Sequence, residues 1–256
     1  MAERIDSIRN KIKKNQLSLG SWITMADPMV VEIMCQSGFD WLAIDMEHSA
    51  ITLPQTQNHV RIIQLSGLAA FVRVEENNPN LIKRVMDTGA DGVIVPMVNS
   101  RQEAEKAVSS VRYPPAGKRG VGLARGQGYG LNFNEYKKRH HKNMVVVQIE
   151  HIQAVENLED ILSVEGVDSF IVGPYDLSGS LGFPGQFDHP KVKKALDRIM
   201  QVSKKMKMPA GFHVIPADAK LVEKKIREGF RFISFSIDMI FLKTVVSFQV
   251  KVLKKI

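Results

Sequence analysis

The stretch Val167–Ser178, VDSFIVGPYDLS, carries the pattern that decides the fold. A short run rich in Val, Ile and Phe stops at Gly173-Pro174, and the carboxylate Asp176 follows at once. A run of this length is typical of a strand covered on both faces, because helices need longer patterns and Gly-Pro stops regular structure. The stretch therefore predicts a buried strand that ends in a polar site.

A second apolar run with the same kind of ending lies upstream. Met144–Ile149, MVVVQI, contains Gln148 and is followed by Glu150. If the two runs are neighbouring parallel strands, Glu150 and Asp176 meet at the edge where both strands end. Oxygen ligands from carboxylates are what Mg²⁺ and similar hard cations prefer, so this edge is a candidate divalent metal site.

The same strand-and-helix unit repeats along the whole chain. Short apolar strands alternate with amphipathic helices, and such a pattern needs a parallel sheet with both faces covered. The sequence predicts one (β/α)8 TIM barrel over residues 1–256, with a charged N-terminal helix and an apolar, lysine-bearing C-terminal helix from about Ile240. The predicted strands lie at residues 17–24, 39–48, 68–74, 91–97, 144–150, 167–173, 210–214 and 230–236.

Composition excludes several classes of protein. The chain of 256 residues is 44% apolar and 24% charged, which is ordinary for a globular protein and argues against disorder and against a membrane protein. The N-terminus has no apolar secretion signal, and the single Cys35 cannot form an intrachain disulfide, so we expect a cytoplasmic protein. The net charge is +8, but the densest basic run, Lys137–Lys142, lacks interleaved aromatics; we expect no nucleic-acid partner and no membrane partner.

Polar side chains collect at the predicted strand ends, where catalytic groups of such barrels lie. Asp45 stands inside the apolar pattern LAIDMEH, where an unpaired charge would be costly, so it needs a partner, and His48 is the natural one by proximity. A carboxylate that fixes the tautomer of a histidine makes that histidine a better general base. The strand-end residues are Asp45, Glu47, His48, Arg73, Glu75, Gln148, Glu150 and Asp176.

Two other sequence features narrow the chemistry. The segment Tyr113–Asn143 is too long for an ordinary connection and so has a functional role, but it is no dinucleotide loop, because Arg125 occupies a position where G-x-G-x-x-G needs glycine. The predicted strands contain no lysine, and a Schiff-base lysine has to project into the site from a strand. The predicted strands therefore offer no lysine for Schiff-base catalysis.

Long segments in a fixed order resemble the HpcH/HpaI aldolases, the metal-dependent (class II) pyruvate aldolases that include 4-hydroxy-2-oxoheptanedioate aldolase. The resemblance covers Ser18 to about Leu242. It rests on GFDWLAIDMEH (38–48), FVRV (71–74), LIKRVMDTGADGVIVPMV (81–98), RYPPAGKRGVG (112–122), VQIE (147–150) and VEGVDSFIVGPYDLS (164–178).

The resemblance implies reversible cleavage of a 4-hydroxy-2-oxo acid to pyruvate and an aldehyde. It assigns Glu150 and Asp176 as ligands of Mg²⁺, Mn²⁺ or Co²⁺ and places Arg73 on the keto oxygen. His48 and Asp45 are the implied acid/base pair, and Asp87 an acidic group linked to the site from the neighbouring helix. The implied substrate contacts are Arg73, Gln148, Gly173 and the backbone N–H groups of Tyr175 and Asp176; Pro174 has no N–H to contribute.

The resemblance also bears on partners and on alternatives. The family's last helix commonly packs on a neighbouring subunit, so we expect a homo-oligomer, a hexamer or trimer, that takes small 2-oxo acid and aldehyde substrates. This sequence departs from the pattern at Leu123–Gly130, LARGQGYG, which leaves the aldehyde open, and in the Lys- and Phe-rich tail after Leu242. Two other readings remain: a non-catalytic barrel that binds a 2-oxo acid, and a CoA-ester lyase of the citrate-lyase β type.

Overall fold

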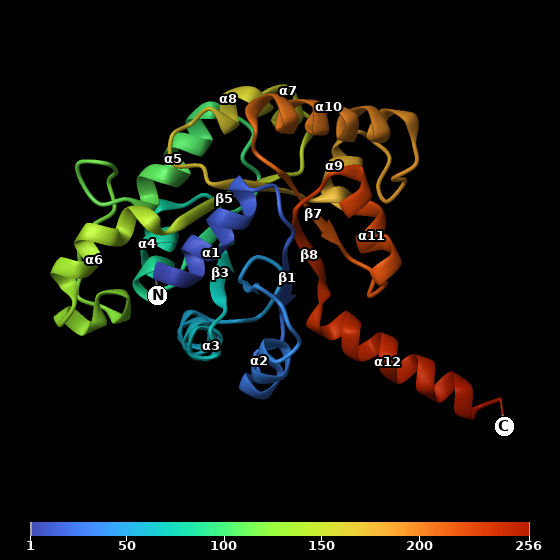
Figure 1. The fold of residues 1–256 in the computed structure, drawn as a ribbon, viewed down its shortest axis with the longest axis horizontal. Helices are drawn as coiled ribbons and strands as arrows, with labels where there is room; N and C mark the ends of the chain where they lie inside the picture. Colours follow the sequence, from blue (N-terminus) through green and yellow to red (C-terminus); the bar gives the residue numbers. More distant parts are fainter. Residues whose placement is uncertain (1, 256) are drawn as a thin grey trace.

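The computed structural model describes residues 2–255 and shows, within them, a closed barrel of eight parallel strands (Figure 1). Each strand pairs with the next along the chain, and β8 pairs with β1 to close the sheet. This confirms the predicted (β/α)8 barrel. The strands are β1 Ser18–Ile23, β2 Trp41–Asp45, β3 Ala69–Arg73, β4 Gly92–Val95, β5 Met144–Ile149, β6 Ser169–Val172, β7 Ala210–Val214 and β8 Phe232–Ile237.

Helices join successive strands on the outside of the barrel, as parallel neighbours require. Between β5 and β6 lie two short helices that meet at Asn157, whose side-chain amide donates to the backbone carbonyl of Asn99 (2.8 Å). The helices are α1 Ala2–Lys13, α2 Pro28–Cys35, α3 Leu53–Leu65, α4 Pro79–Asp87, α5 Arg101–Val111, α6 Phe133–Arg139, α7 Ile152–Glu156, α8 Leu158–Leu162, α9 Pro174–Ser180, α10 Pro190–Met206, α11 Ala219–Glu228 and α12 Asp238–Leu253, with 3₁₀ turns η1 Arg125–Gly130 and η2 His140–Lys142.

The barrel interior is filled by side chains that alternate along each strand. On β2, Trp41 belongs to the inner cluster, whereas its neighbour Leu42 packs in the layer between strands and helices. Trp41 stacks on Phe232 with ring centroids 4.6 Å apart, and Phe71 meets it edge-on at 5.6 Å. Because the middle of the barrel is packed, only the last inward positions of the strands are available for chemistry.

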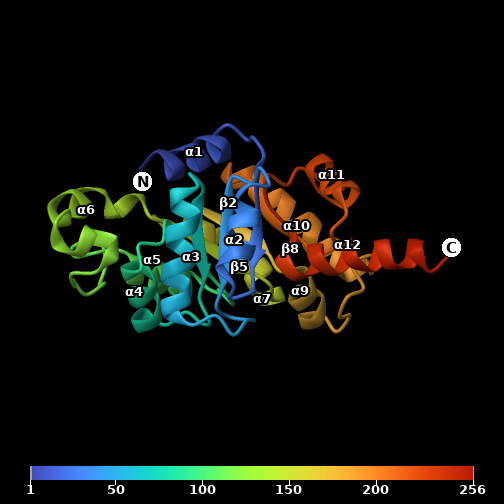
Figure 2. The ribbon, with the colours of Figure 1, turned by 90° about the horizontal axis from the view of Figure 1, so that it is seen from below.

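Helix α1 closes the end of the barrel at which the strands begin. Its residues Ile5, Ile8 and Ile12 are buried in the same cluster as Trp41, and ion pairs such as Arg9 with Asp168 (2.8 Å) hold its polar face. Figure 2 shows α1 and α9 at opposite ends of the barrel. The strand ends that carry the predicted site residues therefore lie on the side that α1 leaves open.

Asp238 ties the β1–β8 seam together at the open end. Its carboxylate accepts hydrogen bonds from the backbone N–H groups of Thr24 (2.8 Å) and Met25 (2.9 Å) and from the Thr24 hydroxyl (2.5 Å). The C-terminal helix α12 begins here and projects away from the barrel (Figure 1).

No helix within residues 2–255 is long and apolar enough to span a membrane.

The long segment Tyr113–Asn143 folds as η1, α6 and η2 on the side of the barrel. The buried guanidinium of Arg119 anchors it by donating to the Tyr136 hydroxyl (2.8 Å) and to the Asp87 carboxylate (2.6 Å). The basic run at residues 137–142 is the end of this helical segment, as expected from the sequence.

The α1 closure gives a stability prediction. Ile8→Ala should lower the free energy of unfolding by about 2–5 kcal/mol, because it leaves a cavity in the inner cluster. The matched change Ile33→Ala, on the 66% exposed Ile33 of α2, should alter it by no more than about 0.5 kcal/mol. Urea titration followed by circular dichroism measures both. Equal effects of the two changes would show that α1 does not close the core.

Candidate active site

The β2–β3 register places a buried ion pair at the open end of the barrel. Asp45 and Arg73 are direct partners in this register, and Arg73 donates from Nε (2.9 Å) and Nη2 (2.6 Å) to the two oxygens of Asp45. Burial acts to raise the pKa of Asp45, but the hydrogen bonds and charge of Arg73, helped by two backbone N–H groups, outweigh it and hold that pKa below its ordinary value. Asp45 is thus an ionised carboxylate that orients the guanidinium.

The expected side-chain pair of Asp45 and His48 is wrong. Only the backbone N–H of His48 reaches Asp45, at 3.2 Å from Oδ1, while the His48 side chain is 68% exposed. We expected His48 to pair with Asp45 because the two residues are close along the chain. The register of β2 and β3 instead puts Arg73 beside Asp45, and its guanidinium binds the carboxylate. The turn after β2, in which the Ser49 hydroxyl donates to the Asp45 carbonyl, presents the His48 ring toward solvent.

Glu47 belongs to the same cluster, although no role for it was predicted from the sequence beyond its place at a strand end. Its Oε2 lies 3.2 Å from Nε of Arg73 and 3.8 Å from Nε2 of His48. This oxygen is buried and has no hydrogen-bond partner among the described residues 2–255. Burial raises the pKa of Glu47 to about 7; the charge of Arg73 opposes this, and the carboxylates of Glu150, Asp45 and Asp176 add to it. Glu47 lies two residues after the end of β2, where the strand pattern of the sequence no longer predicts which side chains are buried.

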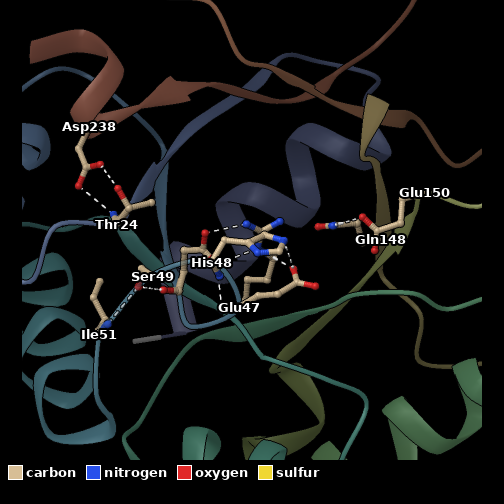
Figure 3. Close-up of polar contacts among 10 residues, drawn as sticks. Thr24, Glu47, His48, Ser49, Ile51, Gln148, Glu150 and Asp238 are labelled. Carbon is tan, nitrogen blue, oxygen red and sulfur yellow. Dashed lines mark hydrogen bonds and ion pairs between the residues drawn. The ribbon is translucent and has the colours of Figure 1, made fainter. Parts of the chain in front are cut away.

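Glu150, at the end of β5, is buried and faces the same space. Its oxygens accept hydrogen bonds from the Met97 backbone N–H (2.8 Å) and from the Gln148 amide, and Figure 3 shows the Gln148 side chain directed at Glu150. Burial, with the charge of Asp176, raises the pKa of Glu150 despite these hydrogen bonds and Arg73. A Cβ at Gly173 would lie 2.7 Å from Glu150 Oε2, so glycine is what allows β6 to approach so closely.

Asp176 and Tyr175 lie in the first turn of α9, directly after β6, and both are exposed. They border a small cavity of about 50 Å³ at the mouth of the barrel. The structure therefore brings together residues that the sequence placed at separate strand ends. The cavity is lined by Trp22, Arg73, Gln148, Ile171, Val172, Gly173, Pro174, Tyr175, Asp176, His213 and Ile215.

His213, on β7, is a cavity residue that the sequence reasoning missed. Its Nε2 is buried and has no hydrogen-bond partner in the part of the chain that the structure describes, and its ring centroid lies 5.5 Å from that of Trp22. Burial and the nearby charge of Arg73 lower the pKa of His213 to about 3, so the imidazole is neutral. The signal was available, because Ala210, Phe212 and Val214 form the outward apolar face of β7 and leave His213 facing inward.

Asp87 lies apart from this cluster within the chain. It ends α4 just before β4 begins, at the end of the barrel opposite to the strand ends, and its carboxylate binds Arg119 (2.6 Å). Within this single chain, Asp87 is therefore far from the residues at the open end of the barrel. Its expected link to the site stays a prediction.

The charges and donor atoms of the cluster fit a divalent cation. The carboxylate of Glu47 is close enough to three other carboxylates to feel their charge, and the guanidinium of Arg73 lies among them. The three carboxylates belong to Asp45, Glu150 and Asp176. No group of three or more His, Cys, Asp or Glu arranged for a metal is found within residues 2–255, so an ion would be held by two carboxylates and completed by water or substrate. An oxygen-only donor set suits Mg²⁺ or Mn²⁺ better than zinc.

Comparisons with known proteins show which family the chain belongs to. The family model for HpcH/HpaI aldolase/citrate lyase matches residues 18–243. A 2-keto-3-deoxy-L-rhamnonate aldolase of Klebsiella pneumoniae is 34% identical over 227 residues, 88% of this chain and 84% of its own. An HpcH/HpaI aldolase/citrate lyase family protein of Burkholderia cenocepacia has a TM-score of 0.91 at 28% identity, over 97% of this chain and 99% of its own. An HpcH/HpaI aldolase of Desulfitobacterium hafniense has a TM-score of 0.88 at 29% identity, over 97% of each chain. The protein belongs to the HpcH/HpaI aldolase/citrate lyase family.

Proposed function

We propose that the protein is a divalent-metal-dependent aldolase that reversibly cleaves a 4-hydroxy-2-oxo acid to pyruvate and an aldehyde. The observation that carries the proposal is the cluster of four carboxylates around Arg73 at the barrel mouth, in which a buried oxygen of Glu47 faces Arg73 but accepts no hydrogen bond within residues 2–255. The curated relative from Klebsiella is named for a 2-keto-3-deoxy sugar acid, which supports a 2-oxo acid as the substrate class.

Glu150 and Asp176 would hold the ion, as the carboxylates at the ends of neighbouring strands β5 and β6. A bound ion would act as a Lewis acid on the keto oxygen of the substrate. Gln148 fixes one oxygen of Glu150 by its amide, and the Met97 N–H fixes the other. Both hydrogen bonds orient the carboxylate before an ion arrives.

Arg73 supplies the fixed positive charge for the developing enolate. Its guanidinium is held by the Asp45 carboxylate and lies over the Trp22 ring, with its carbon 4.4 Å from the ring centroid. A donor oriented in this way needs no rearrangement when charge develops on the substrate. The backbone N–H groups of Tyr175 and Asp176, in the first turn of α9, would receive the substrate carboxylate.

His48 is the candidate base for the 4-hydroxyl of the substrate. Its ring is solvent-accessible next to Glu47, so it can take the proton directly or through a water molecule. The nearest carboxylate to the ring is Glu47 rather than Asp45, at 3.8 Å. Glu47 therefore replaces Asp45 in our proposal as the group that orients His48.

The C-terminal helix supports the proposed homo-oligomer. Helix α12 projects from the barrel and exposes apolar side chains, including Leu242 (56%), Phe248 (62%) and Leu253 (66%). An apolar helix standing free of its own barrel is costly in water and fits burial against another copy.

The first functional prediction concerns the metal. Glu150→Gln and Asp176→Asn should each weaken Mn²⁺ binding at least about tenfold and abolish metal-dependent exchange of the pyruvate methyl protons for deuterium, because each removes a charged ligand. Titration calorimetry and proton NMR measure the two effects. The control Glu135→Gln, on an exposed α6 ion pair, should change neither. Wild-type metal affinity in both site variants would contradict the ligand assignment.

The second functional prediction concerns the role of Arg73. Arg73→Lys should lower kcat for pyruvate proton exchange about a hundredfold, since a point charge cannot reproduce the planar guanidinium, and loss of one such donor costs on the order of 3 kcal/mol in the transition state. Circular dichroism checks the fold of the variant. If KM rises with kcat unchanged, Arg73 binds the substrate without stabilising the enolate.

The third functional prediction distinguishes a metal-dependent mechanism from one that uses a lysine Schiff base. None of the strands in residues 2–255 contains a lysine, so borohydride added with pyruvate should leave the protein mass unchanged. A chelator should abolish proton exchange, and Mg²⁺, Mn²⁺ or Co²⁺ should restore it. Mass spectrometry showing a pyruvate adduct on lysine, or full exchange after exhaustive chelation, would refute the metal mechanism.

A further inference from the structure

One polar group of the cavity has no part in the chemistry described above. His213 borders the cavity, and its Nε2 is buried with no hydrogen-bond partner within residues 2–255. Buried polar atoms are nearly always paired, so an orphan atom in a cavity wall points to a partner supplied by the occupant. The ring is partly exposed and packs beside Trp22, which leaves its edge available to a ligand.

The cavity is small enough that its occupant contacts every wall. Its volume is about 50 Å³, and the wall that contains His213 faces the same space as Arg73, Gly173 and Asp176. His48 is not part of this wall, so the cavity belongs to the 2-oxo acid half of the substrate rather than to the aldehyde half. The group that meets His213 is therefore part of the 2-oxo acid.

The other atoms of a 2-oxo acid already have partners in the proposed mechanism. Its carboxylate and keto oxygen face the metal ligands, Arg73 and the first turn of α9. The third carbon, which becomes the nucleophile, is left for the wall formed by Trp22, His213 and Ile215. A methyl group there would bury Nε2 unpaired, whereas a hydroxyl would pair with it.

A hydroxyl also fits the electrostatics of this wall. The charge of Arg73 acts on His213, and the imidazole beside it is neutral, so a second cation is disfavoured there. A hydroxyl can both donate and accept, and it pairs with Nε2 in either neutral tautomer. A carboxylate on the third carbon could pair only with the tautomer that carries its proton on Nε2.

We propose that the donor substrate is a 2-oxo acid with a hydroxyl on its third carbon, such as hydroxypyruvate, and that Nε2 of His213 hydrogen-bonds this hydroxyl and determines donor specificity. This inference rests on the proposed function, whose donor it names. In the synthetic direction the third carbon loses one proton and bonds to the aldehyde carbon, and the aldehyde oxygen gains a proton. The product is a 3,4-dihydroxy-2-oxo acid, and cleavage is the reverse.

The test compares two donors that differ by one oxygen. The Mg²⁺-loaded protein is incubated in deuterated water with hydroxypyruvate or pyruvate, and exchange at the third carbon is followed by proton NMR after subtraction of the rate without protein. We expect kcat/KM to be higher for hydroxypyruvate by about tenfold or more, because a site built around a hydroxyl rejects the analogue that lacks it. A wild-type preference for pyruvate would overturn the inference.

Variants of His213 make the test specific. In His213→Leu the ratio of the two kcat/KM values should fall to about one or below, and in His213→Asn, which keeps a hydrogen-bonding side chain, it should stay above the value for leucine. The control His141→Leu, on an exposed histidine in η2, should leave the ratio unchanged. An unchanged ratio in His213→Leu would show that His213 only packs against Trp22.

Binding separates this inference from the proposed function. Titration calorimetry of both acids into the Mg²⁺-loaded protein gives a ratio of dissociation constants that needs no chemistry, and it should favour hydroxypyruvate in the wild type and lose that preference in His213→Leu. If neither acid exchanges with Mg²⁺, Mn²⁺ or Co²⁺, the proposed function fails, and the binding ratio alone decides the role of His213.

Discussion

The guanidinium of Arg73 is the charge on which the open end of the barrel depends. It pairs with Asp45 and lies against Glu47, and its charge also reaches Glu150. Removing one partner from such a buried pair leaves an uncompensated charge, which is strongly destabilising. The compensation is nevertheless incomplete, because burial, together with the charges of neighbouring carboxylates, raises the pKa values of Glu47 and Glu150 even with Arg73 present. A divalent cation would supply the missing positive charge, and this links the stability of the site to its proposed chemistry.

The two ends of the barrel divide stability from function. At the closed end, α1 covers the inner cluster with apolar side chains and with ion pairs such as that of Lys11 with Asp40. At the open end, the last inward positions carry charged and polar groups that a closed core would not accept. Burial of the inner cluster can therefore stabilise the carboxylate cluster, which taken alone is repulsive.

The sequence predicted the barrel and most strand positions, because short continuous apolar runs and the Gly-Pro stop are local signals. It also placed Glu150 and Asp176 at neighbouring strand ends, which follows from strand order. It failed where the partner comes from another strand: Asp45 pairs with Arg73 across the sheet, although His48 is closer along the chain. It also missed His213, because one polar residue among apolar neighbours resembles a core histidine until the inward face of β7 is known.

Register is what joins the fold to the chemistry in this protein. Asp45 and Arg73 are both the last residues of their strands and are direct partners, and both side chains point inward with Trp41 and Phe71 below them. A slip of β3 by one residue would turn Arg73 toward the helices and place Val72 at the mouth. The aromatic layer would be broken by the same slip, since Phe71 would leave its contact with Trp41. The packing of the inner cluster thus selects the register, and the register in turn puts the guanidinium among the carboxylates.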